Sequence, residues 1–596
     1  DDRNIPWLQK IGDEVRDNDG KLFIQLFYTS WGRNTAPQQS SMYESDVPLT
    51  IPAPSSITNA TLGVHLVEMT VDEIHQVSED FADAAVRAVK GGVDGVEISL
   101  HHLMLHAQFF SKIYNRRTDE YGGSMENRVR FAIETLQRVR DAVGNSIAIG
   151  YRVNARYENP ADNSLEDMKE IIQYINSNVE VDYVSVSAGG GASPTMSAPM
   201  GYLAPGYQMP DTAEIKAVTD VPVFGIGSIT SPFQAEDALE KNQCDLVLMV
   251  RQLFADPEFG NKAREGRPDD IRPCVRYNYC TTRFPFRVGC FQNVAHGREL
   301  KWGIGTIEKA ETPKGVMVIG GGAAGLEAAV VAAKRGHYVA LFEGEERIGG
   351  RLRLQAKLPM QYEWGNLIAW YEHTLRQPNV VVHTGEPVTS ENIQGLIEEQ
   401  QPDAVILASG SSSSPDGFVQ GTSGSIPGWE SKMVLRYEDV LDQKVEVGQH
   451  VTIFDNVSNE LAIGLGTFLA KMGRSVSIVT PYTALGSDRN TSHNFRDVHL
   501  AELLNQPNVT VHAETFVQRI EEGEIFLANH ITHGEVVEPT GEKTDSLILI
   551  NHFDRDQALQ DAVAKTELEM HVVGDAVGYG PIHDAILEGH RVGRLV

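Results

Sequence analysis

Short apolar runs alternate with longer amphipathic segments over the first part of the chain. Six of these runs have the length and composition of buried strands. Residues 71–92 and 124–144 instead carry apolar side chains at helical spacing. Repeated strand–helix units predict a parallel sheet, and about eight such units close into a barrel. The strand-like runs are 21–26, 92–99, 146–153, 181–188, 221–227 and 244–250.

These six runs leave the α/β segment about two strands short of a TIM (β/α)8 barrel. The chain opens on residues 5–20, which have the pattern of a barrel helix but follow no strands. We therefore expect an N-terminal barrel whose first strands are absent. Either the sequence omits an N-terminal segment, or another chain completes the barrel.

The second half begins with a strand, a glycine turn, a helix and a second strand over residues 315–351. The turn reads GxGxxG, and an acid follows about 20 residues later, where a ribose hydroxyl would be held. A later strand-like run within 571–578 ends at a further acid, Asp575. The pattern predicts a Rossmann-like module for an adenine nucleotide. Its expected binding residues are Gly320, Gly322, Gly325, Glu343, Arg351 and Asp575.

A second Rossmann-like unit follows at 450–480, but its turn is not rich in glycine. Residues 455–460 read Asp-Asn-Val-Ser-Asn-Glu. Side chains there block the close approach of a pyrophosphate, and the acids repel it. We interpret this unit as a degenerate NAD(P)H-type module that acts as a scaffold. The expected domains are 1–270 (barrel), 271–312 (cysteine-containing junction), 313–440 with 545–596 (adenine-nucleotide module) and 441–544 (degenerate module).

Composition narrows the class of protein. The 596 residues are 41% hydrophobic and 22% charged, as in a soluble globular protein. A net charge of −30 argues against nucleic acid as a partner, and fits either a solvated acidic surface or a patch that steers a basic partner. No apolar run approaches the roughly 20 residues that span a bilayer. Only four cysteines occur, so we expect a reducing, cytoplasmic compartment rather than a disulfide framework.

Three of the cysteines lie together, where the barrel segment gives way to the nucleotide module. Cys274, Cys280 and Cys290 are candidate metal ligands with the spacing C-x5-C-x9-C. Clustered thiolates at a domain junction suggest electron transfer through an iron–sulfur cluster. A cubane needs four thiolates, however, and the spacing offers three. Cys244, within the last strand-like run, is most simply a core residue.

Barrel chemistry sits at the C-terminal ends of the strands. Arg152, at the end of a buried strand, needs an anion or an electron-rich ring. The alternative for Arg152 is a structural ion pair. Glycine-rich backbone with Arg251 after the last strands would make a phosphate cradle. The strand ends carry Gln25, Ser99, His102, Arg152, residues 187–191, residues 225–228 and residues 249–251.

Four segments resemble the Old Yellow Enzyme family, in particular its long branch with trimethylamine dehydrogenase and dienoyl-CoA reductase. They are 25–33, 94–102, 115–131 (with its YGGS-x-ENR run) and 249–274. The resemblance covers essentially the whole chain. It implies FMN in the barrel and either FAD or ADP in the C-terminal module. The FMN-binding positions that it implies are Gln25, Arg152, Gly227, Ser228 and Arg251.

The active-site positions depart from the ene-reductases of that family. Those enzymes hold a substrate carbonyl with two histidines, or with a histidine and an asparagine, and protonate carbon with a tyrosine. The matching positions here are Ser99, His102 and Met104. Methionine cannot donate a proton, and serine substitutes poorly for histidine. This pattern counts against ene reduction.

Oxidation of an amine needs no proton donor to carbon. It needs an apolar or aromatic bowl and a group that accepts the amine proton. His102 matches the histidine of the trimethylamine dehydrogenase site, so His102 and Tyr28 are the candidate catalytic residues. Tyr28 or Ser30 replaces a family histidine, and Tyr28 and Trp31 are candidate walls of the bowl. The alternative for His102 is a structural histidine bonded to a backbone carbonyl.

The cysteine pattern resembles the branch of dimethylglycine and N-methylproline demethylases. Tyr277 stands where the second cluster ligand is expected, so three thiolates could hold a three-iron cluster, hold a four-iron cluster with a non-cysteine ligand, or be a relic. We expect a flavin-dependent dehydrogenase or N-demethylase of a small secondary or tertiary amine. An oligomer is expected, with electrons passing to an electron-transferring flavoprotein or a redox subunit. The alternatives are an NAD(P)H-dependent ene or dienoyl reductase and a non-catalytic electron-relay subunit.

Overall fold

A computed structural model of the chain divides into two compact units. The first comprises Asp1–Pro199 and Leu203–Val250, and the second comprises Met200–Tyr202 and Arg251–Val596. The segment 251–270, expected with the barrel, thus packs with the second unit. The structure describes residues 1–28, 49–59, 64–190, 194–282, 288–414, 417–418, 424–487, 493–529 and 540–596.

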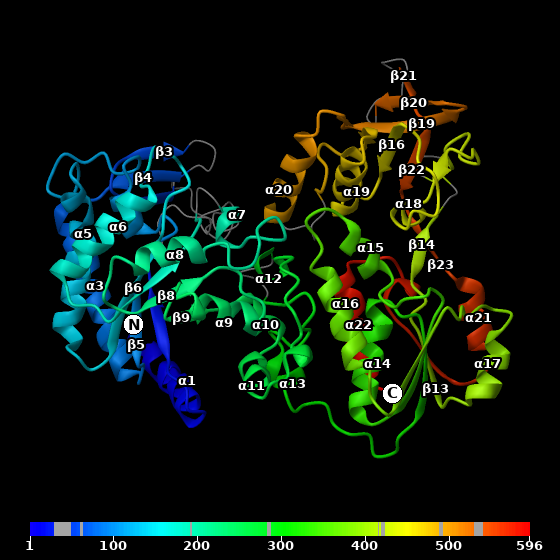
Figure 1. Cartoon of the computed structure of the whole chain (residues 1–596), viewed down its shortest axis with the longest axis horizontal. Coiled ribbons are helices and arrows are strands. Elements are labelled where there is room, and N and C mark those ends of the chain that lie inside the picture. Colours follow the sequence, from blue (N-terminus) through cyan, green and yellow to red (C-terminus); the bar gives the residue numbers. More distant parts are fainter. Residues whose placement is uncertain are drawn as a thin grey trace. The chain divides into compact units, whose positions relative to one another are not determined.

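The first unit is built on a parallel sheet of six strands, which confirms the six predicted runs (Figure 1). The strand order is β1-β5-β6-β7-β8-β9, so β1 and β9 lie at its two edges. The strands are β1 (Phe23–Leu26), β5 (Gly95–Leu100), β6 (Ala148–Asn154), β7 (Tyr183–Ser187), β8 (Val223–Ile226) and β9 (Leu246–Leu248). The helices are α1 (Ile5–Asp17), α3 (Val71–Lys90), α4 (Leu105–Phe110), α5 (Met125–Val143), α6 (Leu165–Asn178), α7 (Pro194–Ser197), α8 (Met209–Lys216) and α9 (Pro232–Glu240).

The interior of this sheet begins with an aromatic layer at the N-terminal ends of the strands. The ring of Tyr183 stacks on Phe224 with centroids 4.5 Å apart and meets the edge of Phe23 at 5.7 Å. Glycines make room for these rings, because a Cβ on Gly95 would lie 1.9 Å from Phe23 and one on Gly150 would lie 2.4 Å from Tyr183. The aromatic layer occupies this end of the half-barrel, and the polar side chains of the interior lie farther along the strands, toward their C-terminal ends.

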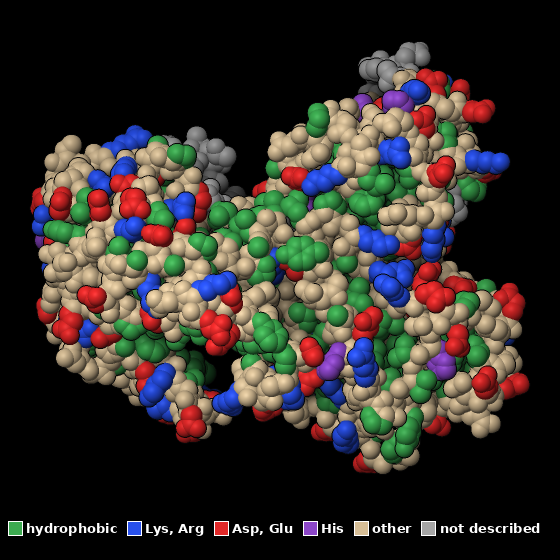
Figure 2. Space-filling model, viewed as in Figure 1, with side chains coloured by type: hydrophobic (Ala, Val, Ile, Leu, Met, Phe, Trp, Pro, Cys, Tyr) green, Lys and Arg blue, Asp and Glu red, His purple; other side chains and the backbone are tan. Residues whose placement is uncertain are grey.

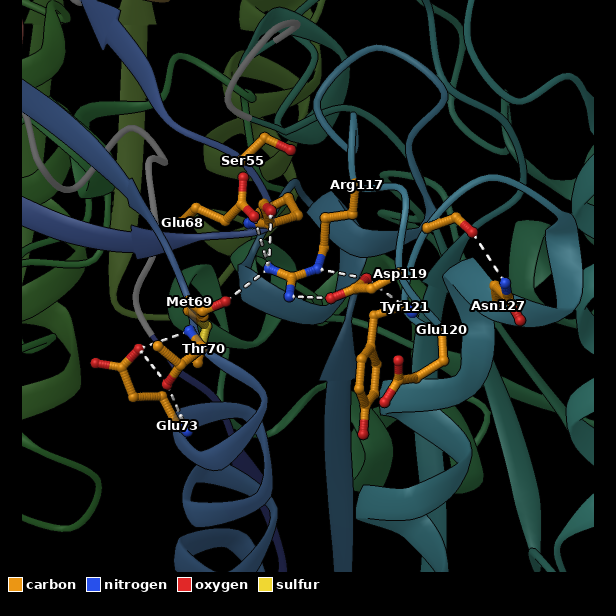
Figure 3. Close-up of polar contacts among 12 residues, drawn as sticks. Ser55, Glu68, Met69, Thr70, Glu73, Arg117, Asp119, Glu120, Tyr121 and Asn127 are labelled. Carbon is orange, nitrogen blue, oxygen red and sulfur yellow. Dashed lines mark hydrogen bonds and ion pairs between the residues drawn. The ribbon is translucent and has the colours of Figure 1, made fainter.

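A small sheet of β2 (Leu49–Ala53), β4 (Val64–Glu68) and β3 (Ile57–Asn59) is tied to the loop that carries the fingerprint 115–131. Figure 3 shows the guanidinium of Arg117 between the two segments. It donates to the carbonyls of Pro54 at 3.2 Å and Met69 at 2.6 Å, and it pairs with Asp119 at 2.5 Å. The fingerprint 115–131, the most specific motif of the sequence, therefore holds the backbone next to β2 and β4 in place.

The second unit contains a five-stranded parallel sheet in the order β12-β11-β10-β13-β24. Helices α14, α16 and α22 lie on one face of this sheet, and α17 and α21 lie on the other (Figure 1). Their apolar side chains pack against the two faces. The strands are β10 (Gly315–Ile319), β11 (Tyr338–Glu343), β12 (Val380–Thr384), β13 (Ala404–Leu407) and β24 (Glu569–Val572). The helices are α14 (Ala323–Arg335), α15 (Arg351–Lys357), α16 (Trp364–Thr374), α17 (Ile393–Gln400), α21 (Gln557–Ala564) and α22 (Ile582–Gly593). Short helices α10 (Arg251–Ala255), α11 (Phe259–Arg264), α12 (Tyr279–Thr282) and α13 (Glu299–Trp302) precede it.

A second parallel sheet has the order β15-β22-β16-β17-β18. Its strands β15 (Val434–Leu435) and β22 (Ser546–Ile550) fall outside the predicted limits 441–544, because the buried run of β22 pairs with β16 (His450–Asp455). The other elements are β17 (Ser475–Val479), β18 (Val509–His512), α18 (Tyr437–Leu441), α19 (Glu460–Lys471), α20 (His493–Leu504), the sheet of β19 (Thr515–Glu521), β20 (Glu524–Asn529) and β21 (Thr540–Lys543), and the pair β14 (Ser411–Ser413) and β23 (Phe553–Arg555).

A buried carboxylate holds the second unit together around α14. Glu327 is 1% exposed and accepts hydrogen bonds from Tyr371 Oη and His590 Nδ1, each at 2.9 Å. Arg272 pairs with it at 3.2 Å. Burial by itself would raise the pKa of Glu327, but the charge of Arg272 and the hydrogen bonds from His590 and Tyr371 lower it to about 2. Arg272, Tyr371 and His590, which are far apart in the sequence, thus meet at the carboxylate of Glu327.

Acidic and basic side chains are interspersed over the face shown in Figure 2. Within the part of the chain that the structure describes, no helix has the length and apolar character required to cross a bilayer.

Replacing Arg117 tests the structural role of the fingerprint. Its side chain is 3% exposed, so Arg117→Met would leave Asp119 and two carbonyls without their partner. We expect a loss of about 3 kcal/mol in the free energy of unfolding, measured by urea denaturation. The neighbouring Arg116→Met is the matched control, because the side chain of Arg116 donates from an exposed position. Equal stabilities of the two variants would contradict this role.

Candidate functional site

Above the aromatic layer, four neighbouring strands contribute polar side chains that meet at one carboxylate. Glu97 Oε1 accepts a hydrogen bond from Gln25 Nε2 at 2.6 Å and lies 2.9 Å from Arg152 Nε. Glu97 Oε2 accepts a hydrogen bond from Ser185 Oγ at 2.5 Å. The structure therefore brings Gln25 and Arg152 together, as expected of one site. The predicted site residues omit Glu97, although an acid inside the fully buried β5 is a signal in itself.

Arg152 supplies a test of whether the site fits FMN. Its Nε is buried, and its approach to Glu97 lacks hydrogen-bond alignment, so among the described residues this atom has no hydrogen-bond partner. A guanidinium that is not fully satisfied by protein suits an electron-rich ring with acceptor oxygens. Gly227 and Ser228 directly follow β8 at the same edge of the sheet, where Ser228 adopts a left-handed φ of 58°. The polar layer and this turn fit the group.

Arg251 lies in the second compact unit, at the start of α10. Its Nη1 donates a hydrogen bond to Asn278 Oδ1 at 2.6 Å. The structure thus gives Arg251 a partner near the cysteine junction, whereas the other four FMN-binding candidates lie in the first unit.

His102 follows β5 in a left-handed conformation with φ 55°. Its Nε2 lies 3.0 Å from the carbonyl oxygen of Ala188 and 3.1 Å from Ser187 Oγ. A carbonyl only accepts, so Nε2 carries the proton. Burial lowers the pKa of His102 to about 4, and the charge of Arg152 also lowers it. The ring is therefore neutral at physiological pH, in the arrangement expected of the structural alternative.

The other residues considered for catalysis, Tyr28, Ser99 and Met104, have different surroundings. Tyr28 is half-buried and packs against the core of the first unit. Ser99 Oγ hydrogen-bonds His101 Nδ1 at 3.0 Å, and Met104 precedes α4. Ser30, Trp31 and Gly191 lie outside the described residues.

The glycine turn of the first Rossmann-like module has the geometry that its pattern predicts. Gly320 adopts φ 106°, and a Cβ there would lie 2.2 Å from the Ala408 carbonyl oxygen. A Cβ on Gly325 would lie 1.9 Å from the Gly320 carbonyl oxygen, whereas Gly322 faces open space at the start of α14. The first and third glycines allow close packing, and the second leaves the helix N-terminus open to a phosphate.

A cavity of about 590 Å³ adjoins this turn. Glu343 accepts a hydrogen bond from Gly321 N at 2.9 Å, and Arg351 pairs with Asp575 at 3.0 Å. Asp575 lies in a 3-10 turn after β24 rather than within the strand. Five of the six predicted nucleotide-binding residues line this cavity, and Gly325 packs behind it. The five are Gly320, Gly322, Glu343, Arg351 and Asp575.

A second cavity, of about 230 Å³, shares four lining residues with the first. Seven of its seventeen lining residues carry aromatic rings, which the sequence motifs did not indicate. Arg351 lies over the ring of Tyr579 at 4.5 Å, and Tyr579 stacks on Phe553. The aromatic residues of the wall are Tyr277, Tyr279, Phe291, Trp364, Tyr437, Tyr579 and His583.

The turn of the second Rossmann-like module is closed by its own side chains. Asp455 Oδ1 accepts hydrogen bonds from Val457 N at 3.1 Å and Ser458 N at 2.8 Å. Asn459 caps α19 through Leu461 N at 3.0 Å. The N–H groups of Val457, Ser458 and Leu461, in the turn and at the start of α19, are therefore bonded to side chains of the chain itself.

The three junction cysteines are free thiols, and Cys274 and Cys290 share one small apolar cluster. Burial, followed by repulsion from Cys274, raises the pKa of Cys280 to about 11 and that of Cys290 to about 12. Tyr277 is buried against Phe291 and Trp364, with ring centroids 5.1 and 5.5 Å away. Among the described residues, which exclude 283–287, no group of three or more His, Cys, Asp or Glu could hold a metal ion. The described side chains thus do not fit an iron–sulfur cluster.

Comparisons with known proteins cover both units. The model of the NADH:flavin oxidoreductase / NADH oxidase family matches residues 1–270, and that of pyridine nucleotide-disulphide oxidoreductase matches residues 314–571. N,N-dimethylglycine/sarcosine dehydrogenase of Chromohalobacter salexigens is 33% identical over 584 residues, 94% of this chain and 79% of that protein. NADH oxidase of Thermoanaerobacter brockii is 31% identical over 607 residues, 99% and 87% of the two chains. The structure of histamine dehydrogenase from Rhizobium sp. 4-9 is similar with a TM-score of 0.88 and 26% identity, covering 100% of this chain and 86% of that one.

The depressed pKa of His102 predicts a pH dependence of stability. An unfolded histidine titrates near 6.5, whereas folded His102 titrates at about 4. The unfolded state therefore binds more protons between these values, so the contribution present above pH 6.5 is lost as the pH falls toward 4. We expect the free energy of unfolding to fall between pH 7 and pH 4 by about 3 kcal/mol less in His102→Gln than in the wild-type protein, measured by urea denaturation. Parallel pH profiles of the two proteins would contradict this assignment.

Tyr277 offers a test of the cysteine junction. Tyr277→Cys would change the spacing to C-x2-C-x2-C, which supplies a further thiolate beside three existing cysteines. We expect the wild-type chain to contain substoichiometric iron, and the variant to gain iron and a broad visible absorption beyond that of flavin. Tyr279→Cys, with the wrong spacing, is the control and should gain none. Stoichiometric iron in the wild-type protein would contradict the reading of the junction.

Proposed function

The chain belongs to the NADH:flavin oxidoreductase / NADH oxidase family, and from this premise we propose that it oxidises a small secondary or tertiary methylated amine, with hydride transfer to FMN. The electrons then pass to a partner, an electron-transferring flavoprotein or redox subunit. The family supplies FMN-dependent oxidoreductase chemistry. Two relatives are amine dehydrogenases by name, which supports the substrate class.

The observation that carries this proposal is the closed turn at Asp455. A pyrophosphate at a Rossmann turn needs the N–H groups at the start of the helix, together with the local positive potential. Here the carboxylate of Asp455 accepts hydrogen bonds from two N–H groups of the turn that precedes α19. Asn459 caps α19 by accepting from one N–H at its start, and Glu460 is the first residue of that helix. This arrangement opposes binding of NAD(P)H, so electrons enter from the substrate and leave to a partner.

The barrel residues suit the removal of hydride. FMN, when bound, supplies the hydride acceptor. Arg152 and Gln25 would hold it from the polar layer, and the neutral ring of His102 adds no second positive charge beside an amine. Among the residues aligned with the ene-reductase pair and tyrosine, neither Ser99 nor Met104 is suited to protonate carbon. The catalytic roles of His102 and Tyr28 remain part of the proposal.

The C-terminal module is proposed to hold an adenine nucleotide in the 590 Å³ cavity, with Glu343 on the ribose and the start of α14 on the phosphates. The aromatic cavity beside it favours FAD over ADP, because a planar ring can extend from one cavity into the other. The domain limits that we propose keep the adenine-nucleotide module discontinuous, with the degenerate module inserted in it.

A second candidate function is reduction of an alkene with NAD(P)H. The NADH oxidase of Thermoanaerobacter brockii, similar over nearly the whole chain, favours it. A third, an electron-relay subunit without its own catalysis, would bind an adenine nucleotide but no FMN.

Anaerobic stopped-flow mixing separates the three functions. We expect sarcosine or dimethylglycine to bleach the flavin absorbance of the full-length holoprotein, and NADH or NADPH to leave it unchanged on the same timescale. Rapid bleaching by NADH or NADPH would overturn the dehydrogenase proposal in favour of the reductase. Absence of FMN from the purified chain, or absence of turnover with a panel of methylated amines and an artificial acceptor, would favour the relay subunit.

A further inference from the structure

Glu97 contacts Gln25 and Arg152, the two flavin-binding candidates that lie on strands of the sheet. Its carboxylate accepts a hydrogen bond from Gln25 Nε2 at 2.6 Å and lies 2.9 Å from Arg152 Nε. Ser185 Oγ donates to its other oxygen at 2.5 Å. The partners come from β1, β6 and β7, on both sides of β5 in the sheet. One side chain thus sets the geometry of two candidate cofactor ligands.

The carboxylate fixes the orientation of the Gln25 amide. A carboxylate only accepts hydrogen bonds, so the NH2 end of Gln25 faces Glu97 and the amide oxygen faces away from it. An amide oxygen is the end that accepts a hydrogen bond from the ring N–H of a flavin. Glu97 therefore selects the flip state that a flavin requires.

The carboxylate also offsets the charge of Arg152. Glu97 is 6% exposed, and charges at such buried positions act over a lower effective dielectric than in water. Unpaired, the guanidinium would stabilise the added electron density of a reduced flavin, and this raises a reduction potential. The charge of Arg152 reaches its surroundings, since it contributes to lowering the pKa values of His101 and His102. A carboxylate 2.9 Å from Nε weakens that field.

We infer that Glu97 is a positioning residue that orients Gln25 and Arg152 and lowers the reduction potential of FMN in the barrel. The inference rests on the proposed function, because it requires FMN at this site. A lower potential favours the release of electrons to an acceptor, and that is the need of a dehydrogenase that hands electrons to a partner.

The charge is tested with Glu97→Gln, which keeps nearly the same shape. Full-length wild-type and variant chains, loaded with FMN, are equilibrated anaerobically with a two-electron reference dye. We expect the equilibrium to shift at least tenfold toward reduced FMN in the variant, which corresponds to about 30 mV. Ser185→Ala is the matched control, because it removes one donor to Glu97 and no charge, and it should shift the equilibrium far less.

The positioning is tested with Glu97→Asp, which keeps the charge but withdraws it by one methylene. We expect FMN to bind about tenfold more weakly, measured by quenching of FMN fluorescence, because one charge-assisted contact is lost. If Glu97→Gln does not fold, this variant decides the inference, and wild-type affinity in it would overturn the inference.

The outcomes distinguish this inference from the proposed function. FMN bound by Glu97→Gln with an unchanged dye equilibrium would overturn the role of Glu97 and leave amine oxidation standing. A wild-type chain that binds no FMN would overturn the proposed function, and the inference with it.

Discussion

A carboxylate buried inside a parallel sheet must be met by donors from neighbouring strands, and Glu97 meets this requirement in the first unit. Its partners on β1, β6 and β7 are held at fixed positions because leaving the charge unpaired is costly. The aromatic layer below it closes one end of the interior. The remaining end, toward the strand C-termini, carries an arginine, a glutamine and a neutral histidine, which we propose as the groups that meet a ligand. Glu327 follows the same rule in the second unit, where it joins α14 to distant segments.

Much of the fold was predictable because its signals are local. The six barrel strands, the helices at 71–92 and 124–144, and the GxGxxG module each follow from a short pattern of residues. The limits of the modules have weaker local signals. The strand β22 belongs to the second Rossmann-like sheet since it pairs with β16, nearly a hundred residues earlier, and no local signal records such a pairing. The first compact unit ends at Val250, whereas the flavin oxidoreductase family model extends to residue 270, the expected limit of the barrel.

The candidate site was predictable to a smaller degree. Gln25 and Arg152 could be named from strand ends, but the residue that joins them contacts them only across the sheet. The aromatic cavity likewise combines the cysteine junction with the ends of two modules. The most specific motif, residues 115–131, proved to bind backbone through Arg117. A motif that holds a scaffold can identify a family while it is silent about the substrate, because substrate choice depends on the loops that the scaffold carries.

The turn at Asp455 has a consequence for how the module responds to its environment. Ligands stabilise a fold by an amount that depends on their concentration, and an empty nucleotide site ties stability to the cellular nucleotide supply. In the turn before α19 the anion, the carboxylate of Asp455, is covalently part of the chain, so its effective concentration does not change. Under our proposal that this module binds no nucleotide, its stability does not depend on the concentration of nucleotide. The melting temperature of this module should therefore be independent of nucleotide concentration, as it is for a protein without a nucleotide site.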